Sequence, residues 1–515
     1  MSDDHAYQAI SAYDDPIGRL APTPNIDRIA RQGMRFDNAF VENSLSTPSR
    51  ACLITGMYSH QNGQLQLEEG IDTTLTYFPE LLQQAGYQTG FVGKWHLCGT
   101  PKGFDSYHML FNQGEYYNPV FRSHDSNGEF VREEGYATEL ITQHAKDFLE
   151  NRDKQKPFCL MIHHKAPHRN WVPAEKYLGM YDSITFPLPS TFYDDYATRG
   201  SAAHTQKMSV EKDLTMLSDL KIDMVKDRPY KVSRFIGRLN QDQTESLMNY
   251  YMRRNDKFHE NPPQGHQLAQ WKYQAYLRDY LSVIHSVDES VGEILDYLEA
   301  NGLTENTIVV YTSDQGFYLG EHGWFDKRFM YEQSLRTPLL IMYPKAIKAG
   351  TVCRQMVQNI DYAPTFLSLA GIEKPTYMSG RSLEPLFDGK EVKQWRTSIY
   401  YHYYDYPTWH LVRKHDGVRT ERYKLIHFYG KGGERARDEN QYQNVPGTRE
   451  YNSYVYMKND GYFTDDPDVD YMELYDLQTD PDELNNLYGK KGYEKVTARL
   501  TKLLKKYRKD LNISD

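Results

Sequence analysis

Polar side chains that could do chemistry follow three strand-like runs of the chain. In chain order they are Lys94 and His96 after residues 87–92, His168 after residues 157–163, and Asp314 with Gln315 after residues 307–312. Ligands of an open parallel sheet bind outside the carboxyl ends of its strands, so these side chains should meet on one face. Lysines suit an anion, histidines suit proton transfer, and carboxylate and carboxamide oxygens suit a hard cation.

Two carboxylates near the start of the chain fit the same site. Asp3 and Asp4 would add two oxygen ligands if a strand of the same sheet preceded them. Three or four oxygen ligands, completed by water and substrate, suit Ca²⁺ or Mg²⁺ rather than zinc. Each motif alone has a structural alternative: an Asp-Gln pair after a strand is usually a turn, and a lysine beside a tryptophan usually extends over the surface. Their shared position is what favours a site.

The elements that must hold these residues alternate between strand and helix. Helical patterns cover residues 24–30, 46–55, 75–85 and 271–301, and further strand-like runs include Pro338–Tyr343. Proline at the first helical positions and glycine after the last ones support the helix limits. Strands separated by helices predict a mainly parallel sheet covered on both faces, in an α/β fold.

Composition changes twice along the chain. Residues of about 185–265 are polar and predict a large insertion of helix and loop. From about residue 390 tyrosine and charge dominate, with strand-like runs at Ser398–Tyr404 and Tyr423–Tyr429 and an amphipathic helix within Leu484–Leu511. We therefore expect a first domain over residues 1–385 and a smaller α+β unit with an antiparallel sheet over 386–515.

Charge and composition exclude several functions for the 515-residue chain. Its formal charge of −10 argues against a nucleic-acid partner, and no run approaches the roughly 18 apolar residues of a membrane span. The 4 cysteines show no disulfide framework, and the first residues have no secretion-signal pattern. The 43 tyrosines mainly indicate packing, although rings and hydroxyls also suit sugars.

One segment carries a specific resemblance. Ser46–Gly56 (STPSRACLITG) matches the sulfatase signature Cys/Ser-x-Pro-Ser-Arg-x-x-x-Leu-Thr-Gly, with Ile54 in place of leucine. The chain therefore resembles the formylglycine-dependent sulfatases over nearly its whole length. Other segments that look like family motifs are Gly93–Leu97, Ala166–His168, Ser313–Gly316 with glutamine in place of the frequent asparagine, Gly320–Gly323 followed by Lys327, and Leu474–Leu477.

The resemblance implies a fold and a cofactor set. The fold would be α/β and alkaline-phosphatase-like, with a large mixed, mainly parallel sheet flanked by helices and a C-terminal α+β subdomain. A maturase would convert Ser46 to formylglycine. This residue would lie at a helix N-terminus, whose positive end favours the binding of an anion. One divalent cation, Ca²⁺ with Mg²⁺ as the alternative, would bind Asp3, Asp4, residue 46, Asp314 and Gln315.

The resemblance also assigns catalytic roles. The hydrated aldehyde at position 46 would attack sulfur, and elimination would then release sulfate. Lys94 and Lys327 would stabilise charge on the sulfate, and Arg50, which lies on the same helix face as residue 46, would hold that residue. His168 would protonate the leaving oxygen, and His96 would accept the proton of the second hydroxyl.

Similarities outside the signature indicate that the expected substrate is a sulfated sugar. Stretches such as Gln113–Pro119 and Tyr401–Tyr404 look like bacterial enzymes that act on the 6-O-sulfate of N-acetylglucosamine in glycosaminoglycan or mucin glycans. Besides Lys94, His168 and Lys327, the expected sugar-binding residues are Asp326, His402, His410, Arg413 and His415. The alternatives are a sulfated-glycan-binding protein whose Ser46 stays unmodified, and a related phosphatase or phosphonate monoester hydrolase.

The start of the chain departs from the family pattern. Members of the resembled family have a strand before the Asp-Asp pair and a secretion signal before that strand, which implies a periplasmic or secreted protein. Here Asp3 and Asp4 follow Met1 and Ser2 directly. We expect the neighbouring strands to be left unpaired where that strand would lie.

Overall fold

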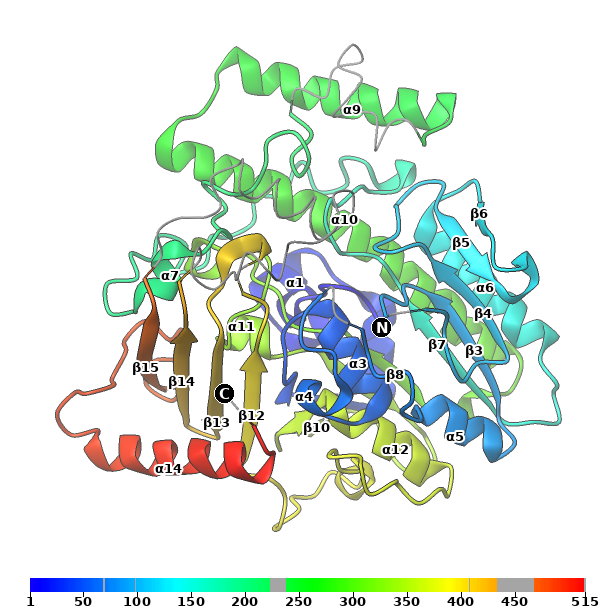
Figure 1. The fold of residues 1–515 in the computed structure, drawn as a ribbon. Helices are drawn as coiled ribbons and strands as arrows, with labels where there is room; N and C mark the ends of the chain where they lie inside the picture. Colours follow the sequence, from blue (N-terminus) through cyan, green and yellow to red (C-terminus); the bar gives the residue numbers. More distant parts are fainter. Residues whose placement is uncertain (68–69, 98, 223–237, 407, 433–466, 514–515) are drawn as a thin grey trace, which may run out of the picture.

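The computed structural model describes residues 1–67, 70–97, 99–222, 238–406, 408–432 and 467–513. Two sheets with helices around them form the larger part of the molecule, and a separate antiparallel sheet lies beside them (Figure 1). The order of elements therefore agrees with an α/β unit followed by an α+β unit.

The first sheet carries Lys94, His96 and His168 at the ends of its strands. Its order is β6-β5-β4-β3-β7, and β3 pairs in parallel with both β4 and β7. The strands are β3 (Gln88–Gly93), β4 (Ser106–Leu110), β5 (Val120–Ser123), β6 (Phe130–Arg132) and β7 (Phe158–His163). Helix α6 (Ala137–Asn151) packs on β3 and β7, while α5 (Phe78–Gln84) packs on β3.

The second sheet carries Asp314 and Gln315. Its order is β10-β1-β9-β8, in which β1 pairs in parallel with β10 and antiparallel with β9, and β8 pairs antiparallel with β9. The strands are β1 (Met34–Phe36), β8 (Val309–Thr312), β9 (Leu339–Met342) and β10 (Thr351–Cys353). A short parallel pair, β2 (Ala39–Phe40) with β11 (Val357–Gln358), lies apart from it. The sheets are therefore mixed in direction.

The two sheets end at β7 and β8, which face each other across a cavity. The cavity holds about 740 Å³ and is lined by both strands and by apolar side chains such as Leu149 and Leu298. At one end Met1 N–H donates to Ile162 O at 2.8 Å, and Ser2 forms a parallel bridge with Ser313. Beyond that point no strand among the described residues joins β7 to β8. The unpaired edges expected from the sequence are present at this place.

Helices flank these sheets. The 36-residue α10 (Gly265–Ala300) contacts α6 and α2 (Pro24–Gln32), and α12 (Tyr362–Leu369) contacts α3 (Ser46–Thr55). The polar insertion contains α7 (Ser201–Thr205) and α9 (Gln241–Glu260). Short helices are α1 (Pro16–Leu20), α4 (Ser59–Asn62) and α11 (Glu332–Leu335). Among the helices of the described ranges, none has the length and apolar character needed to cross a bilayer.

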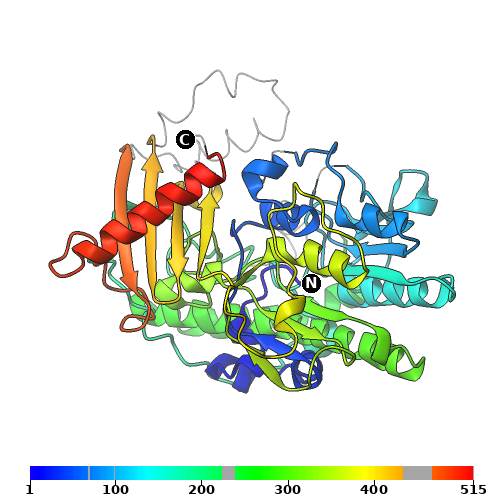
Figure 2. The same ribbon diagram turned by 90° about the horizontal axis from the view of Figure 1, so that it is seen from below.

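The C-terminal unit is one antiparallel sheet covered by a helix. Its strands β12 (Ser398–Tyr403), β13 (His415–Thr420), β14 (Tyr423–Gly430) and β15 (Val469–Asp476) pair in sequence order. Helix α14 (Glu494–Asp510) lies across them (Figure 2). Since β12 begins this separate sheet, we keep the proposed domain boundary near residue 386.

Candidate active site

Helix α3 points its first residue at the acidic start of the chain. The helix begins at Ser46 after an extended Leu45, has Pro48 in its first turn and ends before Gly56, whose φ of 66° is the left-handed conformation that glycine adopts freely. Every residue of α3 is buried. Ser46 Oγ donates to Asp3 Oδ1 at 3.0 Å, so the helix N-terminus and the acidic residues form one site.

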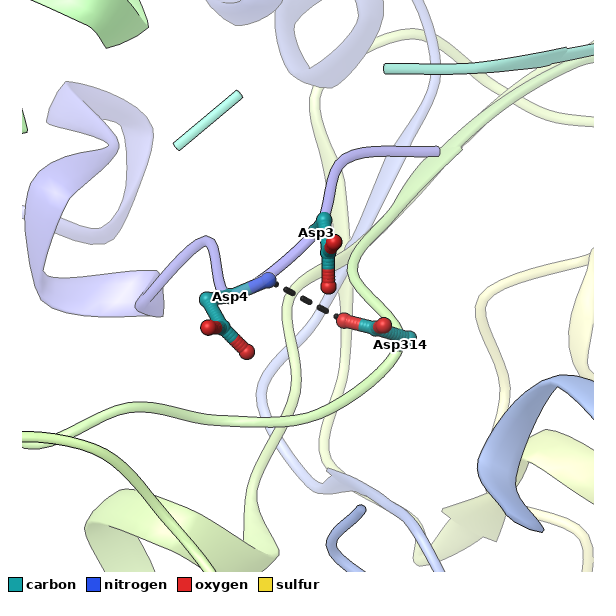
Figure 3. Close-up of side chains that lie close together, drawn as sticks. All are labelled: Asp3, Asp4 and Asp314. Carbon is teal, nitrogen blue, oxygen red and sulfur yellow. Dashed lines mark hydrogen bonds between the residues drawn. The ribbon is translucent and has the colours of Figure 1, made fainter. Parts of the chain in front are cut away.

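Three carboxylates gather at this point. Ligand oxygens of Asp3, Asp4 and Asp314 lie within 4.8 Å of one another, and all three residues are buried. Figure 3 shows Asp3 and Asp4 on the first segment of the chain beside Asp314, and Asp4 N–H donates to Asp314 Oδ1 at 3.1 Å. Gln315 also belongs to the cluster because its amide nitrogen donates to Asp4.

Three buried cations balance these carboxylates. Arg50 donates to Asp314 Oδ2 from both Nε and Nη2, and its Nη2 lies 3.7 Å from Asp3 Oδ1. Lys94 Nζ is paired with Asp3, and Lys327 Nζ lies 2.5 Å from Asp4 Oδ1. Buried charges are costly unless they are paired and hydrogen-bonded, so each of these carboxylates needs a positive charge beside it. The cluster is therefore a preformed array of opposite charges.

The pKa values of Asp3 and Asp4 diverge. Burial would raise the pKa of Asp3, but Lys94, His168 and Arg50 together hold it well below its usual range. Burial raises the pKa of Asp4 to about 7 against the opposing effect of Lys327, and repulsion by Asp3 and Asp314 adds to the rise. A bound cation would favour the charged form of each carboxyl.

Two histidines stand beside the cluster. His96 Nδ1 lies 3.3 Å from Thr47 Oγ1, and its Nε2 lies 3.0 Å from the Gln113 amide nitrogen. His168 Nδ1 donates to Arg169 O at 2.8 Å, which leaves Nε2 facing Asp4 Oδ2 at 3.9 Å. Burial holds the pKa of both histidines well below the usual value, and a bound anion would act in the opposite direction.

Polar groups from three segments of the chain gather beside Asp326, next to Lys327. His410 Nε2 lies 3.3 Å from Asp326 Oδ2, and Arg328 donates to Asp326 Oδ1 at 3.1 Å. Arg169 forms a bidentate pair with the buried Asp219, and its guanidinium lies 5.1 Å from the Phe325 ring. Carboxylate, imidazole and guanidinium groups of this kind can bind sugar hydroxyls.

Backbone strain coincides with these positions. Non-glycine residues with positive φ include Asp4 at 64°, His96 at 53°, Asp326 at 75°, Arg328 at 89° and His410 at 73°. Each such residue costs on the order of 1–3 kcal/mol and persists only where its surroundings fix it, which happens most often at functional sites. The clustering of strained residues around Asp4 and Lys327 is independent support for a site here.

Most residues expected from the sequence are brought together, and three are not. Ser46, Arg50, Lys94, His96, His168, Lys327 and the four predicted side-chain ligands form the buried cluster, and Asp326 and His410 adjoin it. His402 instead contacts Tyr400 and Tyr429, and Arg413 donates to Lys431 O and Pro467 O. His415 is fully buried and accepts from Met330 N–H. These three belong to or adjoin the C-terminal sheet, so we leave them out of the proposed site.

Sequence reasoning missed several supporting residues. Gln113 contacts both Lys94 and His96, Ser49 donates to Asp314 O, and Asn359 donates to Ser49 Oγ at 2.8 Å. Arg328 follows Lys327 directly, so its place beside the site could have been predicted from the sequence. Asn359 offered none, because its approach to α3 depends on the packing of elements far apart in the sequence.

The donor set fits a hard divalent cation. The side-chain oxygen of Gln315 is buried and has no hydrogen-bond partner among the described residues, although its amide nitrogen is bonded. An unpartnered buried carboxamide oxygen beside three carboxylates is what Ca²⁺ or Mg²⁺ would use, since both prefer oxygen ligands.

Comparison with known proteins identifies the family. Residues 1–372 match the Sulfatase family, and residues 320–456 and 462–510 match the N-sulphoglucosamine sulphohydrolase C-terminal family. The chain belongs to the sulfatase family. It is therefore a sulfuric ester hydrolase of a family that generally uses a metal and formylglycine.

Curated relatives agree. The chain is 45% identical over 524 residues to an N-acetylglucosamine-6-O-sulfatase of Bacteroides thetaiotaomicron, with 100% of this chain and 86% of that protein covered. It is 26% identical to the human N-acetylglucosamine-6-sulfatase, with 76% of this chain and 64% of the human protein covered.

Solved structures confirm the fold of this sulfatase. One of them, described as a complex with its substrate D-glucosamine-2-N,6-O-disulfate, matches with a TM-score of 0.89 and 44% identity, covering 100% of this chain and 97% of that one. A phosphonate monoester hydrolase of Silicibacter pomeroyi matches with a TM-score of 0.65 at 18% identity. The alkaline-phosphatase-like fold expected from the sequence is confirmed.

Proposed function

We propose that this sulfatase hydrolyses the 6-O-sulfate of N-acetylglucosamine, or of a closely related glucosamine, in glycosaminoglycan or mucin glycans. The observation that carries the proposal is the buried charge cluster around Ser46, found in a chain that is 45% identical along its whole length to an N-acetylglucosamine-6-O-sulfatase. Asp326, Arg328 and His410, which come from two segments of the chain and contact one another, supply groups for sugar hydroxyls beside that cluster.

The proposed cofactors are one divalent cation and a formylglycine. Asp3, Asp4, Asp314 and Gln315, with residue 46, would hold one divalent cation, Ca²⁺ or Mg²⁺. A formylglycine made from Ser46 by a maturase would, beside that cation, supply a nucleophilic oxygen at neutral pH. The aldehyde is needed because its hydrate has a second hydroxyl, whose deprotonation expels the sulfate. An ordinary serine has no such hydroxyl and would be left as a stable sulfate ester after one turnover.

The side chains of the protein divide the remaining work. Lys94 and Lys327 stabilise the charge that develops on the sulfate oxygens, and they are already oriented by Asp3 and Asp4. Arg50 fixes Asp314 below the helix N-terminus. His168 donates Nδ1–H to a carbonyl, so Nε2 is the atom left to carry the second proton of the imidazolium. The bound sulfate ester, as an anion, would favour that protonated form, and Nε2–H then delivers its proton to the leaving oxygen. His96, next to Thr47, accepts the proton released at position 46.

Two measurements test this proposal. The first is mass spectrometry of the 36–50 tryptic peptide from protein made with a maturase, in which formylglycine is two hydrogens lighter than serine. The second is sulfate release from N-acetylglucosamine 6-sulfate, its 3-sulfate isomer and an aryl sulfate, with aryl phosphate beside them. We expect the modified peptide and a strong preference for the 6-sulfate.

Other outcomes favour the alternatives. Tight binding of the sugar sulfate with no turnover in fully modified protein would indicate a glycan-binding relative. Faster cleavage of aryl phosphate than of aryl sulfate would indicate a phosphatase or phosphonate monoester hydrolase.

We further propose that the protein works in the periplasm or outside the cell. Its relatives include sulfatases described as extracellular in Caenorhabditis elegans and Drosophila melanogaster, at 25% and 27% identity. Fractionation of the native host and assay of each fraction tests this proposal.

A further inference from the structure

The outward face of α14 is a stripe of positive charge on an acidic protein. The exposed basic side chains of this helix are Lys495, Arg499, Lys502, Lys505, Lys506 and Lys509, while the molecule as a whole carries a formal charge of −10. The acidic residues of the helix, Glu494 and Asp510, lie at its two ends. At about 1.5 Å of rise per residue, the stripe from Lys495 to Lys509 is roughly 21 Å long.

The spacing of these residues places them on one side of the helix. Steps of three and four residues from Lys495 through Arg499, Lys502 and Lys505 or Lys506 to Lys509 follow the helical repeat. The opposite side is apolar: Leu500 and Leu504 are buried in a cluster with side chains of the C-terminal sheet. The helix is therefore anchored by its apolar face, and its cations are exposed to solvent. Figure 2 shows the helix on the outside of the C-terminal sheet.

Most of these cations are not used inside the protein. Lys506 is paired with Asp510, and Arg499 lies 5.8 Å from the Tyr423 ring. Within the described part of the chain, no ion pair involves Lys495, Lys502, Lys505 or Lys509. Arg508, by contrast, points to the sheet and pairs with Asp416. Cations in the last turn also stabilise the helix dipole, but Lys495 and Arg499 lie too far from the C-terminus for that effect.

We propose that this stripe is a binding surface for a linear sulfated polysaccharide, separate from the site that cleaves the sulfate ester. A row of exposed cations attracts a polyanion and raises its local concentration, which an acidic enzyme with an anionic substrate needs. The choice of a sulfated glycan rests on the proposed function. A membrane partner is disfavoured because the apolar face of α14 is buried against the sheet and has nothing to insert into lipid.

The test compares two variants with the same change in charge. K495Q/K502Q/K505Q/K509Q removes four cations from the stripe, and K154Q/K156Q/K390Q/K393Q removes four exposed lysines elsewhere. Binding of a heparin decasaccharide is measured by calorimetry at 0.1 M and 0.3 M NaCl. We expect the stripe variant to bind about tenfold or more weakly at 0.1 M, with a smaller salt dependence, and the control to stay within twofold of the wild type.

Several outcomes would overturn the inference. One is equal losses in the two variants, another is no binding by the wild type, and a third is tighter binding to vesicles of 30% phosphatidylserine in phosphatidylcholine than to heparin. Turnover of a monosaccharide 6-sulfate should be the same in all three proteins. If the wild-type protein binds heparin but does not turn over the sugar sulfate, the proposed function is rejected and this inference is not. If the stripe variant binds heparin as tightly as the wild type, this inference is rejected and the proposed function is not.

Discussion

At the scale of single residues, Asp3 is the point where the parts of the site meet. Its carboxylate accepts from Ser46 at 3.0 Å, pairs with Lys94 and lies 3.7 Å from Arg50. One carboxylate thus links Ser46, Lys94 and Arg50, to which the proposed mechanism gives separate roles. Substitutions around it separate effects on chemistry from effects on stability.

Lys94→Ala should reduce catalysis far more than stability. We expect kcat/KM on a sugar sulfate to fall by about 10²–10³-fold, because one preorganised charge on the sulfate oxygens is lost. Asp3 keeps Arg50 nearby, so the melting temperature in excess Ca²⁺ should change little. Lys102→Ala, which removes a lysine paired with Glu80 at the surface, is the control and should leave kcat/KM unchanged. An unfolded Lys94→Ala protein would contradict the assignment of Lys94 to the anion pocket.

His168→Ala should distinguish between leaving groups. A sugar alkoxide needs a proton as it departs, whereas 4-nitrophenolate does not, so we expect a loss of about 10²–10⁴-fold on the sugar sulfate and a much smaller loss on the aryl sulfate. His124→Ala, at an exposed histidine, serves as the control. Equal losses on both substrates would remove His168 as the proton donor.

At the scale of elements, the sequence predicted what depends on local pattern. The helix Ser46–Thr55 has the predicted limits, and strands β3, β7 and β8 lie within about two residues of theirs. The polar residues after β3 and β7 converge because these two strands are parallel neighbours in one sheet. Asp314 and Gln315 reach the same place from the end of β8 in the second sheet, beside the bridge between Ser2 and Ser313. The antiparallel direction of β9, the contact of Asn359 with Ser49, and the side-chain partners of His402 and Arg413 depend on tertiary packing, which local patterns do not encode.

The cavity between β7 and β8 leads to a prediction at this scale. Its volume is about 740 Å³, and burial lowers the pKa of the Met1 amino group at its end to about 5, so a charged group there is costly. Adding Ile-Val-Val-Ile-Val before Met1 should pair both strand edges and fill the cavity. Each fully buried apolar side chain contributes about 1.5–3 kcal/mol before ordering costs.

The measurement is thermal unfolding together with calorimetric Ca²⁺ binding. We expect a higher melting temperature and tighter Ca²⁺ binding, because Asp3 and Asp4 would be fixed by the added strand. Gly-Ser-Gly-Ser-Gly, as the matched extension, should give neither effect. Identical melting temperatures for the two extensions would show that the cavity does not accept a strand.

At the scale of the whole molecule, buried ion pairs join the two units. Glu332 of the first unit pairs with Arg419 and Lys424 of the C-terminal sheet, and Lys424 also pairs with Glu483. His415 also joins the two units, because its Nε2 accepts a hydrogen bond from Met330 N–H, next to the loop of Lys327. The C-terminal unit thus helps to position the loop that carries Asp326, Lys327 and Arg328.

Protonation of His415 should therefore weaken the contact between the two units. Burial lowers its pKa to about 3, so between about pH 6.5 and pH 3 the unfolded chain binds a proton that the folded protein does not. The contribution of this residue to stability is complete above pH 6.5 and falls by about 1.4 kcal/mol per pH unit below it, or about 2 kcal/mol at pH 5. Glu42 and Glu321, whose pKa values burial raises to about 8 and about 7, act with the opposite sign. The prediction consequently compares two proteins, the wild type and His415→Gln, by urea unfolding in excess Ca²⁺ at pH 7 and pH 5. Between these pH values the free energy of unfolding of His415→Gln should fall by about 2 kcal/mol less than that of the wild type. An equal fall in both proteins would mean that His415 is not held neutral in the folded protein.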